Sequence, residues 1–326
     1  MKIANIIKSA VAVAAFAVIC TVSGVIAQAD NVYQDVKVIA ATDTSVTISW
    51  EEPENYSKTI IGYGTTQAEC KKMLDSKKLY KESGLKTHVL TGLKPGTKYY
   101  VSISYKETFG EGIVPFVVDS EVITNPGQVK GVKLNEWSAG LKKATVLWTE
   151  QSAAAGYEYK LKDASGKVVE SGDAKGPYAV TFDVKNDRVY SLTVRAYANR
   201  DDDKVANSGD EKKIYGKWSK EAYLVPMPEV KKGSASSSGL KFSWQKVAGA
   251  TNYTIYASTS AKKGFKKIAT TKNTSYTIKK LDGKINTEKN YYVYVIANKK
   301  SGSTTIKSQN LFKTKIYGPL FVQVEF

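Results

Sequence analysis

The sequence predicts an all-β protein made of three similar β-sandwiches in tandem. Three strands with alternating apolar residues end in tryptophans that lie 98 and 96 residues apart, namely Trp50, Trp148 and Trp244. Each is followed by a second alternating strand that begins at a tyrosine, namely Tyr99, Tyr190 and Tyr291. A self-similar unit of about a hundred residues has the length of one β-sandwich. No long segment shows the period of a helix.

The first unit covers residues 30–126, where short alternating strands are separated by turns rich in Gly, Pro, Asn and Ser. We expect strands over residues 36–40, 46–50, 59–64, 88–90, 99–105 and 115–123. Residues 67–74 predict one short helix, inserted between two strands. Residues 124–127 are typical of a linker.

The second and third units cover residues 127–226 and 227–326. In the second unit, we expect strands over residues 129–134, 144–148, 157–161, 180–184, 189–197 and 218–225, with a polar loop over 199–213. The Pro226-Met-Pro228 segment indicates a short linker stiffened by proline. The third unit ends on an alternating strand over residues 320–326.

The first 29 residues predict a signal peptide rather than part of a domain. Lys2 and Lys8 give a positive start, residues 9–26 are largely apolar, and Ala27-Gln-Ala29 is a small-residue cleavage pattern, with the cut expected before Asp30. The alternative is an uncleaved membrane anchor, because the apolar run approaches the length of a spanning helix. Ile19, a large residue before Cys20, argues against a lipoprotein signal.

If the leader is removed, Cys70 is the only thiol in the chain. An intramolecular disulfide is then impossible, so each sandwich depends on its own apolar core. Cys70 is interpreted either as a partly buried small apolar residue or as a site of pairing between chains.

The segment Leu93-Lys-Pro-Gly-Thr-Lys-Tyr-Tyr-Val-Ser-Ile103 follows the signature Leu-x-Pro-Gly-Thr-x-Tyr-x-Val-x-Val. With it, the chain resembles the fibronectin type III family, whose fold is a seven-stranded sandwich of immunoglobulin-like architecture. Trp50 resembles the family's core tryptophan, and the Trp244–Tyr253 segment looks like the form common in secreted bacterial proteins. The resemblance implies three tandem domains of this family over 30–126, 127–226 and 227–326.

The resemblance is uneven along the chain. The second unit lacks the Pro-Gly-Thr turn before Tyr190, and residues 281–287 replace that turn in the third unit. None of the units carries an Arg-Gly-Asp tripeptide, so the integrin binding of some family members is not carried over.

We expect six aromatic residues to form the structural core. Each tryptophan packs between two sheets, and each tyrosine buries its ring while its hydroxyl bonds to the preceding backbone, as in a tyrosine corner. These residues are Trp50, Tyr99, Trp148, Tyr190, Trp244 and Tyr291.

Residues for catalysis are scarce, and we expect neither an enzyme nor a cofactor. A nucleophilic triad would need His88, the single histidine, which starts a predicted outer strand. A Cys and His zinc site cannot be assembled. Glu51, Glu52 and Glu54 lie in a turn-rich loop, where a solvated role is favoured over glycoside hydrolysis.

The only metal-like cluster is Asp201, Asp202 and Asp203, which could offer oxygen ligands to calcium. Their spacing matches no known calcium loop, and basic residues such as Arg200 and Lys204 interleave with them. A solvated loop is therefore the preferred interpretation.

Positive charge is concentrated in the third unit. Residues 226–326 contain 18 Lys and 4 acidic residues, a balance of +14, whereas residues 30–126 carry −2 and 127–225 carry +3. Alternation places Tyr256, Tyr292 and Tyr294 outward, and lysine pairs surround them in turns or at strand ends, including Lys299 and Lys300. The competing interpretation is ordinary cross-strand packing with protective edge lysines.

These features predict a secreted, non-catalytic modular protein for surface adhesion or presentation. The expected partner of the third unit is an anionic cell-wall polymer, an acidic glycan or a surface protein. Lysine rather than arginine argues against base-specific binding of nucleic acid. Two alternatives stay open: a glycan-binding accessory module for a separate enzyme, with the three tyrosines as the platform, and a passive spacer.

Overall fold

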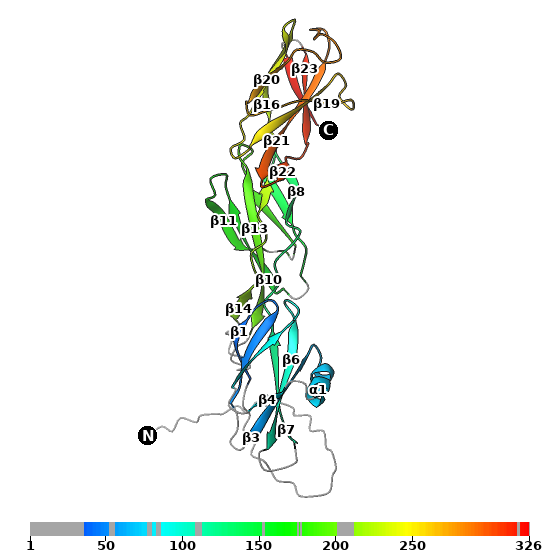
Figure 1. Cartoon of the computed structure of the whole chain (residues 1–326). Helices are drawn as coiled ribbons and strands as arrows, with labels where there is room; N and C mark the ends of the chain where they lie inside the picture. The colour runs from blue at the N-terminus through cyan, green and yellow to red at the C-terminus, as the bar shows by residue number, and fades with distance from the viewer. Residues whose placement is uncertain are drawn as a thin grey trace, which may run out of the picture. The chain divides into compact units, whose positions relative to one another are not determined.

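The computed structural model describes residues 36–51, 56–76, 80–82, 86–107, 113–151, 154–174, 176, 178–200, 212–317 and 320–325. The predicted signal peptide lies outside these residues, as do Cys20, the Asp201–Asp203 cluster, Glu52 and Glu54. The described elements are one helix and antiparallel β-strands arranged in six sheets (Figure 1). The chain is thus all-β, with tandem β-sandwiches, which confirms the predicted fold class.

The first sandwich contains a three-stranded sheet in the order β1-β2-β5 and a four-stranded sheet in the order β4-β3-β6-β7. Alternate residues of β2 and β6, such as Ile48 and Val101, are buried between them. The strands are β1 (Lys37–Ala41), β2 (Ser45–Ser49), β3 (Tyr56–Gly64), β4 (Tyr80–Glu82), β5 (Thr87–Thr91), β6 (Lys98–Glu107) and β7 (Ile113–Ile123).

The predicted helix is present as α1 (Gln67–Asp75) and packs directly on the backbone of β3. Its N-cap is Thr66, whose hydroxyl accepts a hydrogen bond from the Glu69 amide at 3.1 Å. A Cβ at Gly62 would lie 2.6 Å from the Cys70 carbonyl oxygen, so this close approach requires glycine. Cys70 is 1% exposed, and its thiol lies 3.2 Å from the Ser102 hydroxyl.

The second sandwich contains a sheet in the order β12-β9-β8 and a sheet in the order β11-β10-β13-β14, with β15 also pairing β13. The strands are β8 (Lys133–Ser138), β9 (Lys143–Leu147), β10 (Gly156–Lys162), β11 (Val168–Asp173), β12 (Ala179–Asp183), β13 (Tyr190–Arg200), β14 (Lys212–Tyr215) and β15 (Ala222–Leu224). Trp137 on β8 is buried, and its indole N–H donates to the Asn186 Oδ1 at 2.8 Å.

In the first two sandwiches, three strands were not expected from the sequence, namely β4, β11 and β14. In β11 the side chains are mostly exposed on both faces, so no alternation marks the strand. The expected strand over 129–134 begins instead at Lys133. The expected strand over 218–225 is shorter, because residues 216–221 are not in a strand and β15 begins at Ala222.

The third sandwich contains a sheet in the order β16-β17-β20 and a sheet in the order β19-β18-β21-β23-β24, with β22 pairing β21. The last strand, β24, pairs with β23 at the edge of the larger sheet. The strands are β16 (Val230–Ser236), β17 (Gly239–Trp244), β18 (Asn252–Ser258), β19 (Lys266–Thr271), β20 (Ser275–Ile278), β21 (Tyr291–Ser301), β22 (Thr304–Lys307), β23 (Phe312–Tyr317) and β24 (Leu320–Glu325).

The buried apolar residues fall into three clusters, each centred on one of the repeated tryptophans. Trp50, Trp148 and Trp244 are 3%, 5% and 3% exposed. The third cluster also includes Val189 and Val225, and Leu311 packs against the second. The boundaries at 126/127 and 226/227 therefore stay predictions.

A tyrosine hydroxyl closes the same kind of turn in all three sandwiches. Tyr99, Tyr190 and Tyr291 are buried, and each hydroxyl accepts the backbone N–H of the residue five positions earlier, at 2.8, 3.0 and 2.8 Å. This is the geometry of a tyrosine corner, and it fixes the start of β6, β13 and β21.

Candidate binding surface of the third sandwich

Two of the three predicted platform tyrosines stack on each other. Tyr256 on β18 and Tyr294 on β21 face each other in the strand register. Their ring centroids are 4.8 Å apart and their planes differ by 14°. Phe265 adds a third ring, 5.0 Å from that of Tyr294. Burial, followed by the nearby Tyr256, raises the pKa of Tyr294, so its hydroxyl stays protonated and can donate a hydrogen bond.

Tyr292 lies on the same face, two residues before Tyr294, and is half-buried. Two lysines lie beside these tyrosines: Lys267 opposite Tyr256 and Lys315 opposite Tyr292. We call Tyr256, Tyr292, Tyr294, Lys267 and Lys315 the tyrosine–lysine surface. Nearby, Lys313 donates from Nζ to the Ala261 carbonyl oxygen at 2.7 Å and lies 4.9 Å from the centroid of the Phe265 ring.

Lys299 and Lys300 are not part of this surface. Lys299 lies seven residues along β21 from Tyr292, roughly 23 Å at the rise of a strand. Its ammonium is 5.2 Å from the centroid of the Tyr223 ring. The backbone N–H of Lys300 donates to the Thr251 hydroxyl at 2.9 Å. The lysines that accompany the tyrosines come instead from neighbouring strands, whose register the sequence does not reveal.

The groups that catalysis would need do not converge in the described part of the chain. His88 lies on β5 opposite Ile48, whereas Cys70 lies on α1, which packs on β3 of the other sheet. No group of three or more His, Cys, Asp or Glu side chains that could hold a metal ion occurs among the described residues.

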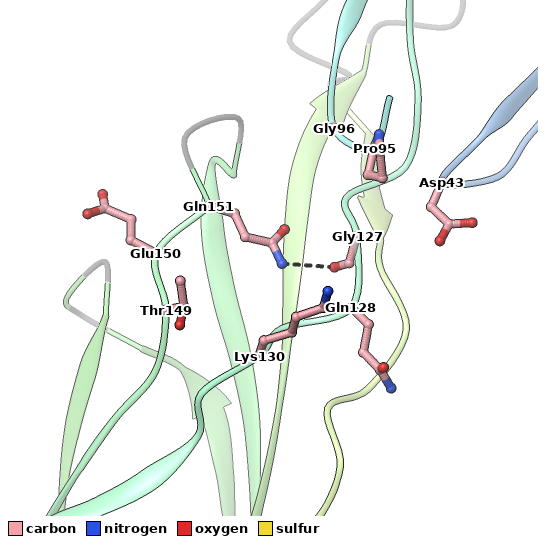
Figure 2. Close-up of a pocket in the computed structure, with 9 residues that line it drawn as sticks. All are labelled: Asp43, Pro95, Gly96, Gly127, Gln128, Lys130, Thr149, Glu150 and Gln151. Carbon is pink, nitrogen blue, oxygen red and sulfur yellow. Dashed lines mark hydrogen bonds between the residues drawn. The ribbon is translucent and has the colours of Figure 1, made fainter. Parts of the chain in front are cut away.

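A hollow of about 510 Å³ is lined by residues that include Asp43, Lys130, Glu150 and Gln151. Figure 2 shows Asp43 and Glu150 on opposite sides of this hollow, with Gln151 between them donating a hydrogen bond to the Gly127 carbonyl oxygen at 3.1 Å. The Asp43 carboxylate lies 3.8 Å from the Lys217 ammonium. Asp43 thus already has a basic partner beside this hollow.

A cation–π ladder on the second sandwich was not expected from the sequence. The Arg195 guanidinium lies 3.7 Å from the centroid of the Tyr215 ring and 4.5 Å from that of Trp218. Lys160 lies 4.6 Å from the same Trp218 ring, and Lys213 lies 4.1 Å from the Tyr197 ring. Arg195 Nε also donates to Glu158 Oε2 at 2.6 Å. Because each cation already has a partner within the chain, the ladder stabilises the sheet rather than forming a binding site.

Comparison with known proteins gives the following similarities. The family model described as "Fibronectin type III domain" matches residues 32–115. No curated protein matches the chain. Among solved structures, the FN1–FN3 domains of chicken CNTN1 are 16% identical, with 90% of this chain and 97% of that chain covered and a TM-score of 0.30. A two-domain fibronectin type III segment of chicken tenascin is 18% identical, with 56% of this chain and 96% of that chain covered and a TM-score of 0.30.

The TM-scores are too low for these two structures to support an inference about function. The described residues contain no helix that is long and apolar enough to cross a membrane. Domains of the matched family are commonly non-catalytic, extracellular modules for adhesion or scaffolding. The match over residues 32–115, which contains the Leu-x-Pro-Gly-Thr-x-Tyr segment and the first buried tryptophan, shows that the first sandwich is similar to a fibronectin type III domain.

Proposed function

We propose that this chain is a secreted, non-catalytic adhesion or presentation protein whose third sandwich binds an anionic polymer of an envelope or glycan surface. The single observation that carries the proposal is the charge imbalance of residues 226–326. Eighteen lysines face four acids there, so most of the ammonium groups have no carboxylate partner within this region. The salt bridge between Lys266 and Asp282, at 2.6 Å, uses one of the four acids.

The tyrosine–lysine surface is the contact region that we favour. Lys267 and Lys315 supply positive charge on either side of the tyrosines. An anionic polymer that lies across the strands could contact both lysines. Lysine is a compact, strongly hydrated charge, which suits a repeating anion more than a single shaped ligand.

The same geometry argues against a flat sugar platform. A sugar ring stacks on the open face of an aromatic ring, but Tyr256 and Tyr294 each cover one face of the other. Tyr294 also contacts Phe265. An electrostatic contact is therefore favoured over stacking with a neutral sugar, although Tyr292 offers a direct test of the latter.

The test is a binding array of immobilised dextran sulfate, polygalacturonate, polyphosphate, purified bacterial cell wall and neutral glucan, probed with the mature chain. We expect binding to the polyanions at about 0.05 M salt and a steep loss at about 0.5 M, because the screening length shortens well below 10 Å. Lys267→Gln with Lys315→Gln should weaken this binding.

The matched control is Lys133→Gln with Lys220→Gln, which removes the same charge from exposed positions of the second sandwich. This control should bind nearly as well as the unmodified chain. Polyanion binding that does not change with salt would contradict the electrostatic mechanism. Binding to neutral glucan that survives high salt and is lost in Tyr292→Ala would favour the glycan-binding accessory module instead. No binding to any of the surfaces would favour the passive spacer.

A further inference from the structure

The outer face of the smaller sheet of the third sandwich carries lysines and small hydroxyl residues. On β17, Leu240, Phe242 and Trp244 point inward and are buried, so Lys241 and Ser243 point outward. The strand register places two rows across the sheet: Lys232–Ser243–Ser275 and Ser234–Lys241–Thr277. We call these six residues the hydroxyl–lysine groove. They lie on the sheet that does not contain the tyrosine–lysine surface.

The surface is hollowed at this position. A concavity of about 430 Å³ is lined by five of the six groove residues together with Gly233 and Phe242. Serine side chains are short and lysine side chains are long, so the serines form a floor between two ammonium groups. The hollow is open to solvent and lies over three neighbouring strands.

The positive charge of the groove has no counterion in the groove itself. Lys232 and Lys241 are diagonal neighbours on adjacent strands, a relation that places Cβ atoms roughly 7–8 Å apart. None of the six residues is acidic. Among the described residues, no hydrogen bond or ion pair engages the six side chains. Like charges on neighbouring strands repel each other, and a bound anion would lower that repulsion.

The equivalent faces of the other sandwiches are not built this way. The position compared lies three residues before the repeated tryptophan of each sandwich. In the first sandwich it holds Thr47, which faces Val89 on the neighbouring strand, and in the second it holds Thr145, which faces Thr181. In the third it holds Lys241, which faces Thr277. In the second sandwich the two threonine hydroxyls are 2.9 Å apart and the adjacent Lys143 pairs with Asp183 at 2.8 Å. In the first, Val89 is 47% exposed. Only the third places lysine at this central position.

We propose that the hydroxyl–lysine groove is a second anion site, which binds the phosphate groups of a phosphodiester polymer. An ammonium group is a point charge suited to phosphate, and serine and threonine hydroxyls donate to the remaining phosphate oxygens. Phe242, the aromatic residue that lines the hollow, points inward and is 2% exposed, so the groove offers no aromatic face for stacking. Two ammonium groups with hydroxyls between them match a chain that carries one phosphate per short polyol unit.

This proposal goes beyond the tyrosine–lysine surface, since it concerns another face and another class of anion. The test measures the affinity of the full chain for a synthetic glycerol phosphate oligomer as a function of salt. The variant is Lys232→Ser with Lys241→Thr, where threonine reproduces the second sandwich and suits a strand. The control is Lys133→Ser with Lys220→Ser, which has the same net charge. Thermal unfolding of both variants verifies that the sheet is intact.

We expect the groove variant to lose about tenfold or more in affinity at low salt, and the control to change by less than about twofold. The slope of log affinity against log salt should fall by about 1.5, because two phosphate contacts are removed. Polygalacturonate, a carboxylate polymer, should bind less tightly and be less affected by the groove variant.

Equal losses in the groove variant and its control would overturn the site, since only total charge would then matter. Equal affinity and equal loss for polygalacturonate would overturn the selectivity for phosphate. If the oligomer still binds in the groove variant but not in the Lys267→Gln, Lys315→Gln variant, the groove is wrong and the proposed function stands. If the unmodified chain binds no polyanion at all, both are wrong.

Discussion

Tyr159 on β10 shows how one buried hydroxyl can make stability depend on pH. The ring lies edge-on to Phe182, with centroids 5.1 Å apart, and the hydroxyl donates to Glu170 Oε1 at 2.9 Å. Burial first, and then the Glu170 carboxylate, raises the pKa of Tyr159 to about 12. The neutral form is therefore favoured in the folded chain. The unfolded chain ionises near the ordinary value of about 10.

The stability that this difference provides is complete below about pH 10 and is lost as the pH rises towards 12. A difference of about two in the pKa between the folded and the unfolded chain corresponds to about 2–3 kcal/mol in the free energy of unfolding. We expect the difference in free energy of unfolding between the unmodified chain and Tyr159→Phe to be constant below about pH 10. Above that it should shift in favour of the variant, as measured by urea denaturation at each pH. A constant difference up to pH 12 would contradict the assignment.

At the same scale, some residue roles could be predicted and others could not. Alternation along a strand is local, so it placed Tyr256, Tyr292 and Tyr294 on one face. That Tyr256 and Tyr294 stack depends on the register between β18 and β21, which the sequence does not contain. Lys299 is separated from Tyr292 by the length of β21 itself, which is eleven residues long and carries the two residues towards opposite ends.

At the scale of elements, β13 owes part of its stability to the cation–π ladder. Arg195 is held between the Tyr215 and Trp218 rings and beside the Glu158 carboxylate. The side chains of Arg195 and Glu158 are 24% and 25% exposed, so water weakens these contacts only in part. Arg195→Met removes both kinds of contact and leaves Glu158 without its cation.

We expect Arg195→Met to lower the free energy of unfolding by about 2 kcal/mol, measured by urea denaturation with tryptophan fluorescence. Arg195→Lys keeps the charge but loses the planar group that stacks on a ring, so its effect should be intermediate. Stability of the lysine variant equal to that of the unmodified chain would show that charge alone is sufficient and that stacking contributes nothing.

Elements with one buried face were predictable, and elements without one were not. The tryptophan strands β2, β9 and β17 alternate between buried and exposed residues, and their positions agree with the expected ones to within a few residues. The edge strand β11 buries almost nothing, so its sequence resembles a loop. The ladder was missed for another reason: Arg195 meets Tyr215 and Trp218 only after the chain crosses residues 201–211.

At the scale of the molecule, the repeat of tryptophan and tyrosine strands predicted a tandem β-sandwich fold, since each repeat must bury its own indole. Charge is distributed differently from apolar residues. The three cores resemble one another, yet the net charge rises from −2 in residues 30–126 to +14 in residues 226–326. Surface charge contributes little to the packing of an apolar core. The requirement to fold therefore does not explain the contrast in net charge.

Salt should consequently act on this chain in two opposite directions. Binding of a polyanion weakens as salt screens the attraction. Folding of the third sandwich should instead strengthen, because a net charge of +14 repels itself within the compact state and salt screens that repulsion as well. Calorimetry of the full chain should show one unfolding transition that is the most sensitive to salt. We expect this transition to move to higher temperature between about 0.01 M and 0.5 M salt.

A charge variant separates this effect from a general action of salt on apolar burial. Lys279→Glu with Lys289→Glu, both at exposed positions outside the two proposed surfaces, lowers the net charge of residues 226–326 from +14 to +10 and should flatten the salt dependence. Lys37→Glu with Lys86→Glu makes the first sandwich more negative and should leave the salt dependence of the third unchanged. A salt response of the same size in all three proteins would mean that self-repulsion is negligible. The charge of the third sandwich would then cost the fold nothing, and its concentration there could no longer be read as a stability sacrificed for binding.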